Sequence, residues 1–264
     1  MEFQNIAIAG LSLGAMGAIF GAVLAYASQK FAVEIDPRAL AIREALPSAN
    51  CGGCGYPGCD AFANAVVAGE APINGCPVGG SECTAALAQI MGLDAAAGAK
   101  QVAYVLCNGG KSHARYQYDY SGVSDCRAAH MLHGGDKACR FSCLGYGTCE
   151  RACPFDAIHM NANGLAEVDP EKCVACGLCI EACPKDVIGY VPYGHEVIVS
   201  CNNKERGGHV KKDCGVACIA CGICQKNCPH DAIHVVNNVA IIDYNKCTSC
   251  RICVEKCPTK AIVG

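Results

Sequence analysis

The spacing of the cysteines constrains this chain more than any other feature. Residues 173–184, 218–229 and 247–258 each follow the pattern C-x2-C-x2-C-x3-C-P. This pattern is typical of [4Fe-4S] ligation, because three closely spaced thiolates let one tight loop hold three irons of a cube while the fourth cysteine reaches a neighbouring cluster. The proline that follows has a fixed φ and no N–H, so it turns the chain away instead of extending a helix. The pattern therefore predicts a protein that handles single electrons.

The composition weakens the rival explanations for so many cysteines. Twenty-five cysteines in 264 residues is a density otherwise found in short, secreted disulfide scaffolds, but here they recur in regular triplets. Zinc ribbons pair two C-x2-C knuckles and use neither a third cysteine nor a Cys-Pro ending. The formal net charge of −3 counts thiols as neutral, and clusters add negative charge, so we expect no nucleic-acid partner.

The N-terminal region contains an uncharged apolar run over residues 6–27, which is long enough to cross a lipid bilayer as a helix. A cleaved signal peptide is the alternative, because residues 25–27 read Ala-Tyr-Ala. No Lys or Arg precedes the run, however, and it is longer than the apolar part of most signal peptides. Lys30, Arg38 and Arg43 follow the run, so the positive-inside rule predicts a single-pass protein of the cell membrane with its cluster-bearing part on the cytoplasmic side.

A compact cysteine unit follows the apolar run. Cys51, Cys54 and Cys59 lie on a glycine-rich loop, and Cys76 is followed by proline. These four cysteines can supply all four ligands of one cluster, so they predict a self-contained [4Fe-4S] site, with zinc as the alternative. Cys83 lies on an expected helix, and we expect it to pack as a buried thiol.

These features together resemble one known family. A hydrophobic N-terminal helix, the loop C-G-G-C-G-Y-P-G-C at 51–59 with its distant Cys-Pro, and ferredoxin motifs resemble the iron-sulfur, B-type subunit of the Rnf complex, the ion-translocating ferredoxin:NAD oxidoreductase of bacterial membranes. The resemblance covers the chain in order. It implies that the chain accepts electrons from reduced soluble ferredoxin and passes them to other membrane and peripheral subunits, where flow to NAD drives Na+ or H+ movement.

The C-terminal half is an internal repeat. Cys-Pro-Phe-Asp-Ala-Ile-His at 153–159 matches Cys-Pro-His-Asp-Ala-Ile-His at 228–234, so each copy is expected to be a two-cluster ferredoxin fold. Asn163-Gly164 and Asn237-Asn238 predict hairpin turns between the motifs. The expected fold class is α+β. The domains are a transmembrane anchor (1–29), a small loop-helix [4Fe-4S] domain (30–93), a first ferredoxin-like module with an N-terminal insertion (94–192) and a second module (193–264).

The regular motifs predict three further ligand sets, because the fourth cysteine of each ferredoxin motif binds the neighbouring cluster. These sets are Cys153, Cys173, Cys176 and Cys179; Cys218, Cys221, Cys224 and Cys257; and Cys228, Cys247, Cys250 and Cys253.

The remaining cysteines depart from the pattern. The repeat aligns Cys143 with Cys218 and Cys149 with Cys224. The position equivalent to Cys221, however, is occupied by Tyr146. Cys139 is the predicted substitute, which gives the set Cys139, Cys143, Cys149 and Cys183. Cys107, Cys126, Cys201 and Cys214 are left over. They predict a sixth cluster at the junction of the modules, with buried thiols or a zinc site as alternatives, so five to six clusters are expected per chain.

No residue is predicted to act in acid–base or nucleophilic catalysis. No G-x-G-x-x-G follows an expected strand, so we expect neither NAD nor flavin on this chain. The basic segment with Lys204, Arg206, His209, Lys211 and Lys212 can steer an acidic ferredoxin or be an ordinary solvated loop.

Two other functions remain open at this point. Ferredoxin modules also occur in the cluster subunits of membrane-bound hydrogenases and formate dehydrogenases, which would bring a nickel or molybdenum partner. A soluble polyferredoxin is the third possibility. The cysteine unit at 51–76 favours the Rnf type.

Overall fold

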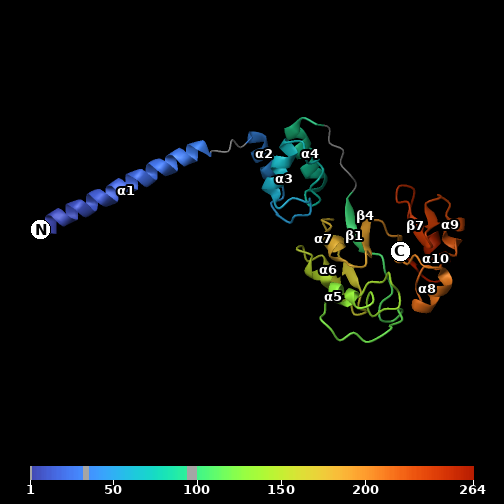
Figure 1. Cartoon of the computed structure of the whole chain (residues 1–264). Coiled ribbons are helices and arrows are strands. Elements are labelled where there is room, and N and C mark those ends of the chain that lie inside the picture. Colours follow the sequence, from blue (N-terminus) through green and yellow to red (C-terminus); the bar gives the residue numbers. More distant parts are fainter. Residues whose placement is uncertain (1, 32–35, 94–99) are drawn as a thin grey trace.

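A computed structural model describes residues 2–31, 36–93 and 100–264 (Figure 1). Helix α1 (Glu2–Lys30) includes the stretch Gly10–Lys30, whose mean hydropathy is 1.7 and which is not buried against the described part of the chain. Large apolar side chains such as Leu13 and Phe20 are therefore exposed along it. The helix is long and apolar enough to cross a membrane.

Three helices form a small unit after α1. They are α2 (Pro37–Ala45), α3 (Cys59–Val67) and α4 (Gly80–Met91), and Figure 1 shows them packed together. Asp36 caps α2 by accepting a hydrogen bond from the backbone N–H of Arg38. Ile42, Phe62 and Leu87 are fully buried between the helices. This core fixes the glycine-rich loop that precedes α3.

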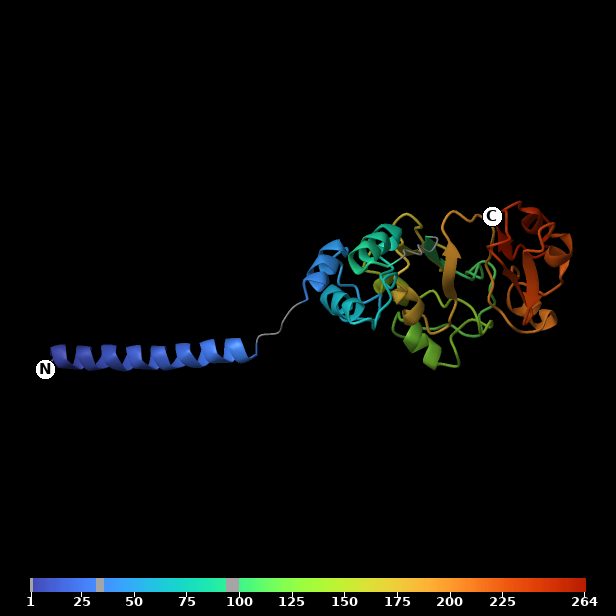
Figure 2. The ribbon, with the colours of Figure 1, turned by 90° about the horizontal axis from the view of Figure 1, so that it is seen from above.

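Both ferredoxin-like modules are built from two antiparallel strand pairs. One pair in each module joins its first and last strands, and the other is an inner hairpin. The first module pairs β1 (Gln101–Val105) with β4 (Ile188–Pro192) and β2 (Ile158–Met160) with β3 (Ala166–Val168). The second pairs β5 (Ile198–Val199) with β8 (Ile262–Val263) and β6 (Ile233–Val236) with β7 (Val239–Ile242). The predicted boundary between 192 and 193 lies between β4 and β5, and Figure 2 shows the two modules side by side.

Short helices alternate with the cysteine loops. They are α6 (Thr148–Arg151), α7 (Leu178–Ala182), α9 (Ile223–Asn227) and α10 (Ile252–Lys256). Gly177 and Gly222 precede two of them with φ of 84° and 70°, and Arg251 adopts the same left-handed conformation before α10. This conformation lets each loop reverse direction before its helix starts.

Three of the Cys-Pro segments end in the same turn. Asp156, Asp231 and Lys260, three residues after their cysteines, have φ of 51°, 49° and 55°. The next backbone N–H then donates to the cysteine sulfur: Ala157 to Cys153 (3.4 Å), Ala232 to Cys228 (3.3 Å) and Ala261 to Cys257 (3.3 Å). Backbone donors aimed at sulfur are typical of cluster ligands.

The two modules are joined by backbone hydrogen bonds. Helix α5 (Cys126–Met131) belongs to the insertion of the first module, and α8 (Gly207–Asp213) belongs to the second. The N–H of Asn108 donates to the carbonyl of Ser200 over 3.1 Å, and the N–H of Arg115 donates to that of Asp213 over 2.8 Å. These bonds fix the junction between the modules.

The two hairpin predictions have different outcomes. Asn237 and Asn238 have φ of 49° and 64° between β6 and β7, which is the expected turn with both central residues left-handed. In the first module Gly164 is left-handed but Asn163 is not, so the predicted two-residue turn there is wrong. Asn163 is instead held by tertiary contacts, since its side chain accepts a hydrogen bond from the N–H of Ser112.

Candidate functional site: cysteine-lined cavities

Four cavities of roughly 310–350 Å³ are each lined by one set of four cysteines that the sequence analysis grouped together. The sets are Cys51, Cys54, Cys59 and Cys76; Cys153, Cys173, Cys176 and Cys179; Cys218, Cys221, Cys224 and Cys257; and Cys228, Cys247, Cys250 and Cys253. In the second module the motif cysteines 218, 221 and 224 thus meet the fourth cysteine of the next motif, as crossover ligation requires.

A fifth cavity lies at the junction of the modules. It has a volume of about 330 Å³ and is lined by Cys107, Cys139, Cys201 and Cys214. Burial raises the pKa of Cys139 to about 11 and that of Cys201 to about 12. The side-chain amide of Asn203 donates to the Cys139 sulfur in the same cavity. Four thiols and a donor aimed at one of them form a coherent ligand set.

Cys126 lies elsewhere, beside Cys149. The N–H of Cys126 donates to the hydroxyl of Thr148 over 2.7 Å, at the start of the short helix that carries Cys149. Burial, and after it the nearby thiols of Cys143, Cys126 and Cys183, raise the pKa of Cys149 to about 12. Cys143 and Cys149 lie in one buried core against which Cys183 packs, so the four cysteines are neighbours.

The structure thus groups the irregular cysteines differently from the sequence prediction, which placed Cys139 with Cys143 and left Cys126 to the junction. Ser142 closes a turn between Cys139 and Cys143 by donating from its hydroxyl to the Cys139 carbonyl over 2.8 Å. Cys139 then lies against Asn203 of the second module, while Cys126 reaches Cys149 through α5. Only the folded insertion decides which thiol joins which set.

Lys137 is a buried cation between these two sets. Only 2% of its surface is exposed, and its ammonium donates to the carbonyls of Gly109 (2.9 Å) and Cys143 (2.7 Å). Gly109 follows Cys107 in the junction cavity. The ammonium therefore links the loops of both sets and places positive charge beside both groups of thiols. Sequence reasoning missed this residue, because a lysine before a cysteine carries no sign of burial.

The small unit contains a fifth thiol beside its set of four. Cys83 on α4 is 6% exposed, as expected of a buried thiol. It also forms a hydrogen bond with Cys76 that lowers the pKa of Cys76 to about 6 and raises that of Cys83. If Cys76 binds iron as a thiolate, it can only accept, and Cys83 is then the donor. The sequence analysis did not predict this contact.

The small unit contacts the first module through a glycine. A Cβ at Gly53 would lie 2.8 Å from the carbonyl oxygen of Cys176 and 3.0 Å from its Cβ. Only glycine permits this approach. Gly53 lies between Cys51 and Cys54, so the contact brings two cysteine sets together.

The donor chemistry of these cavities fits iron-sulfur clusters better than single metal ions. Within the described ranges, no three His, Cys, Asp or Glu side chains converge closely enough to hold one metal ion. Four thiolates on one zinc would lie about 2.3 Å from a common centre. Sets of four thiols around one cavity, with backbone N–H groups donating to sulfur, instead match the ligands of an iron-sulfur cluster.

Comparison with protein families locates iron-sulfur domains in the same three segments. Residues 46–78 match the family described as "Putative Fe-S cluster". Residues 139–190 and 217–262 match two families described as 4Fe-4S dicluster domains. The expected α+β layout, with an N-terminal apolar helix, a small cluster unit and two ferredoxin-like modules, is confirmed.

Comparison with characterised proteins identifies close relatives. The B-type subunit of the Na(+)-translocating ferredoxin:NAD(+) oxidoreductase complex of Acetobacterium woodii is 53% identical over 89% of this chain and 71% of its own length. The proton-translocating counterpart of Clostridium ljungdahlii is 47% identical over 88% and 82%. The B-type subunit of the ion-translocating oxidoreductase complex of Methanosarcina acetivorans is 42% identical over 95% of both chains. The chain therefore belongs to the family of B-type subunits of ion-translocating ferredoxin:NAD(+) oxidoreductase (Rnf) complexes.

Proposed function

We propose that this chain is the iron-sulfur electron-transfer subunit of an ion-translocating ferredoxin:NAD oxidoreductase, and that it carries six [4Fe-4S] clusters. The observation that carries the proposal is the gathering of 24 of the 25 cysteines into six sets of four. Bound clusters supply one-electron redox chemistry, and the protein tunes their potentials through hydrogen bonds, burial and charge.

The ligand assignment follows the observed groups. Four sets are those predicted from the regular motifs and from residues 51–76. The other two are Cys126, Cys143, Cys149 and Cys183 in the first module, and Cys107, Cys139, Cys201 and Cys214 at the junction.

Contacts between the sets support a serial relay along the chain. Gly53 of the first set touches Cys176 of the second. The first module holds its two sets in one core that includes Cys149 and Cys179. The thiol of Cys107 in the junction set lies close enough to Cys143 to add to the rise in pKa that burial causes there. Cys201 of the same set packs against the core that contains Cys218 and Cys224 of the second module. The sets thus adjoin in order from the small unit to the second module.

The proposed setting is a membrane complex. Helix α1 spans the bilayer once, and Lys30, Arg38 and Arg43 keep the modules on the cytoplasmic side. Reduced ferredoxin is the donor, and the subunits that bind flavin, NAD and the transported ion are separate chains. The names of the relatives describe ferredoxin:NAD(+) oxidoreductase complexes, which supports ferredoxin as the donor and NAD as the acceptor.

Iron and acid-labile sulfide in the anaerobically purified chain test the proposal. Six clusters require about 24 iron atoms per chain, and five require about 20. We expect Cys107→Ala and Cys126→Ala each to lose about four irons and one distinct electron paramagnetic resonance (EPR) signal. Cys83→Ala is the matched control and should lose none. Zinc without sulfide would refute the function, and unchanged iron in Cys107→Ala would remove the junction cluster.

A further inference from the structure

Charge is distributed unevenly along this acidic chain. The second module, residues 193–264, carries nine Lys or Arg and six Asp or Glu, whereas the preceding 192 residues carry 12 and 18. The side chains of the second module therefore carry an excess of positive charge, which offsets the negative charge of the clusters that the module would bind. Such an asymmetry creates a local field that attracts acidic partners.

The same module exposes two of its ligand cysteines. All 25 cysteines lie within the described residues, and only Cys221 and Cys250 are classed as exposed. Both belong to the second module, at the end of the proposed relay. An electron can enter from a separate protein most directly where a ligand sulfur reaches the surface.

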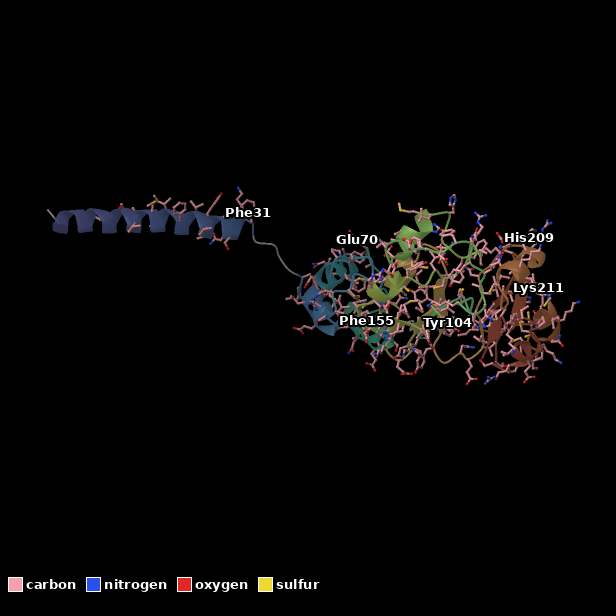
Figure 3. The ribbon with its side chains drawn as sticks, turned by 90° about the horizontal axis from the view of Figure 1, so that it is seen from below. Phe31, Glu70, Tyr104, Phe155, His209 and Lys211 are labelled. Atoms are coloured by element: carbon pink, nitrogen blue, oxygen red, sulfur yellow. The ribbon has the colours of Figure 1, made fainter. Side chains whose placement is uncertain are left out.

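Helix α8 places positive charge beside one of these cysteines. Gly207, its first residue, lies so close to the carbonyl of Ile219 that no Cβ would fit, and Ile219 belongs to the loop between Cys218 and Cys221. Val210 is fully buried under the helix. His209 and Lys211 extend from the end of the molecule formed by this module, away from the small unit (Figure 3).

The positive charges of this surface are uncompensated. Lys204, Arg206, Lys211 and Lys212 are exposed, and none of them forms an ion pair with a residue in the ranges that the structure describes. We call these four residues, together with Cys221, the basic docking surface.

We propose that the basic docking surface binds a small acidic one-electron carrier protein of the ferredoxin class. This inference rests on the proposed function, since it names where the donor docks. One electron leaves the reduced carrier, which becomes oxidised, and enters the second module, which becomes reduced; no bond forms or breaks. A permanent partner fits the surface less well, because stable interfaces are depleted in lysine, whereas transient redox encounters rely on charge complementarity.

Binding and electron transfer in the full-length, cluster-loaded chain in detergent test the proposal. The probe is a purified acidic bacterial ferredoxin, and its affinity is measured anaerobically at several salt concentrations. The test variant carries Lys204→Glu, Lys211→Glu and Lys212→Glu. The matched control carries Lys100→Glu, Lys111→Glu and Arg127→Glu on the first module, which changes the net charge equally.

We expect the test variant to lose about tenfold or more in affinity and in second-order reduction rate, with a weaker salt dependence, because steering depends on local charge. In the control variant, affinity and rate should each change by less than about twofold, because its altered charges lie away from the basic docking surface. Equal losses in both variants, or no loss in the test variant, would overturn the proposal. The proposal would also be overturned if the test variant kept its affinity for ferredoxin but lost another component of the purified complex. As a further control, both variants should keep their full iron content and be reduced by dithionite, which would show that the cluster relay itself is intact.

Discussion

The side-chain amide of Asn203 donates a hydrogen bond of 3.2 Å to the sulfur of Cys139, although the two residues are 64 positions apart. Asn203 is 1% exposed and Cys139 is 7% exposed. Cys139 belongs to the first module and Asn203 to the second. The junction set is therefore oriented by both modules at once, which ties its electrostatics to their packing.

Asn203→Leu should lower the reduction potential of the junction cluster. A hydrogen bond to sulfur stabilises the extra negative charge of the reduced state, so its loss makes reduction harder. A bond worth about 1 kcal/mol corresponds to roughly 40 mV for one electron. An EPR-monitored redox titration measures the shift. Asn202→Leu is the control, because the Asn202 amide bonds the Asp186 carbonyl instead of a sulfur; an equal shift there would contradict the assignment.

Cys83→Ala should lower the potential of the cluster held by the small unit without releasing iron. The Cys83 thiol donates to the Cys76 sulfur, which is why the pKa of Cys76 falls to about 6. A thiol is a weak donor, so we expect a shift of about 20–40 mV. Cys83→Ser keeps a donor at the same position and should restore most of the potential. Loss of four irons in Cys83→Ala would instead make Cys83 a ligand.

Gly53→Val should weaken the contact between the small unit and the first module. Its new side chain would meet the Cys176 carbonyl, and such overpacking costs about 1–3 kcal/mol. Iron content should stay constant, while rapid-freeze EPR shows slower electron equilibration between the two sets. Gly55→Asn is the control, because Gly55 has open space around it and its φ of 84° is tolerated by asparagine. If electrons equilibrated equally fast in Gly53→Val and in the unchanged protein, electron transfer through this contact would be excluded.

The regular cysteine sets were predictable because their geometry is local. Each three-residue step from Cys218 to Cys224 requires only a tight loop, and the left-handed Gly222 lies within that loop. The Cys-Pro ending predicts a turn for the same reason. Such features depend on a few neighbouring φ values, which the residue types themselves restrict.

The irregular sets were not predictable because they depend on tertiary packing. Spacing alone paired Cys139 with its neighbour Cys143, yet the folded insertion carries Cys126 to Cys149 and leaves Cys139 facing Asn203. The repeat alignment did reveal that a set was incomplete. Asn203 itself carries no sequence signal, since its role depends on a sulfur 64 residues away.

Asp125→Ala should loosen the helix that begins with Cys126. Asp125 caps α5 by accepting from the N–H groups of Arg127 (2.8 Å) and Ala128 (3.2 Å), and it also accepts from the Thr148 hydroxyl (2.9 Å). Loss of such a cap costs about 1–2 kcal/mol. Chelator-driven iron release from the Cys126 set should therefore become severalfold faster at neutral pH, followed by the loss of its EPR signal.

The pH dependence of this effect follows from the same carboxylate. The hydrogen bond from Thr148, followed by those from the backbone and Arg151, lowers the pKa of Asp125 to about 2. Its unfolded value is near 3.9, so its stabilisation is fully present above about pH 5 and disappears as pH falls towards 2. The difference in urea midpoint between Asp125→Ala and the unchanged chain should thus be constant from neutral pH to about pH 5 and shrink below about pH 4. Asp36→Ala removes the cap of α2 instead, and it should leave iron release from the Cys126 set unchanged. Equal iron release in both variants would show that Asp125 does not position Cys126.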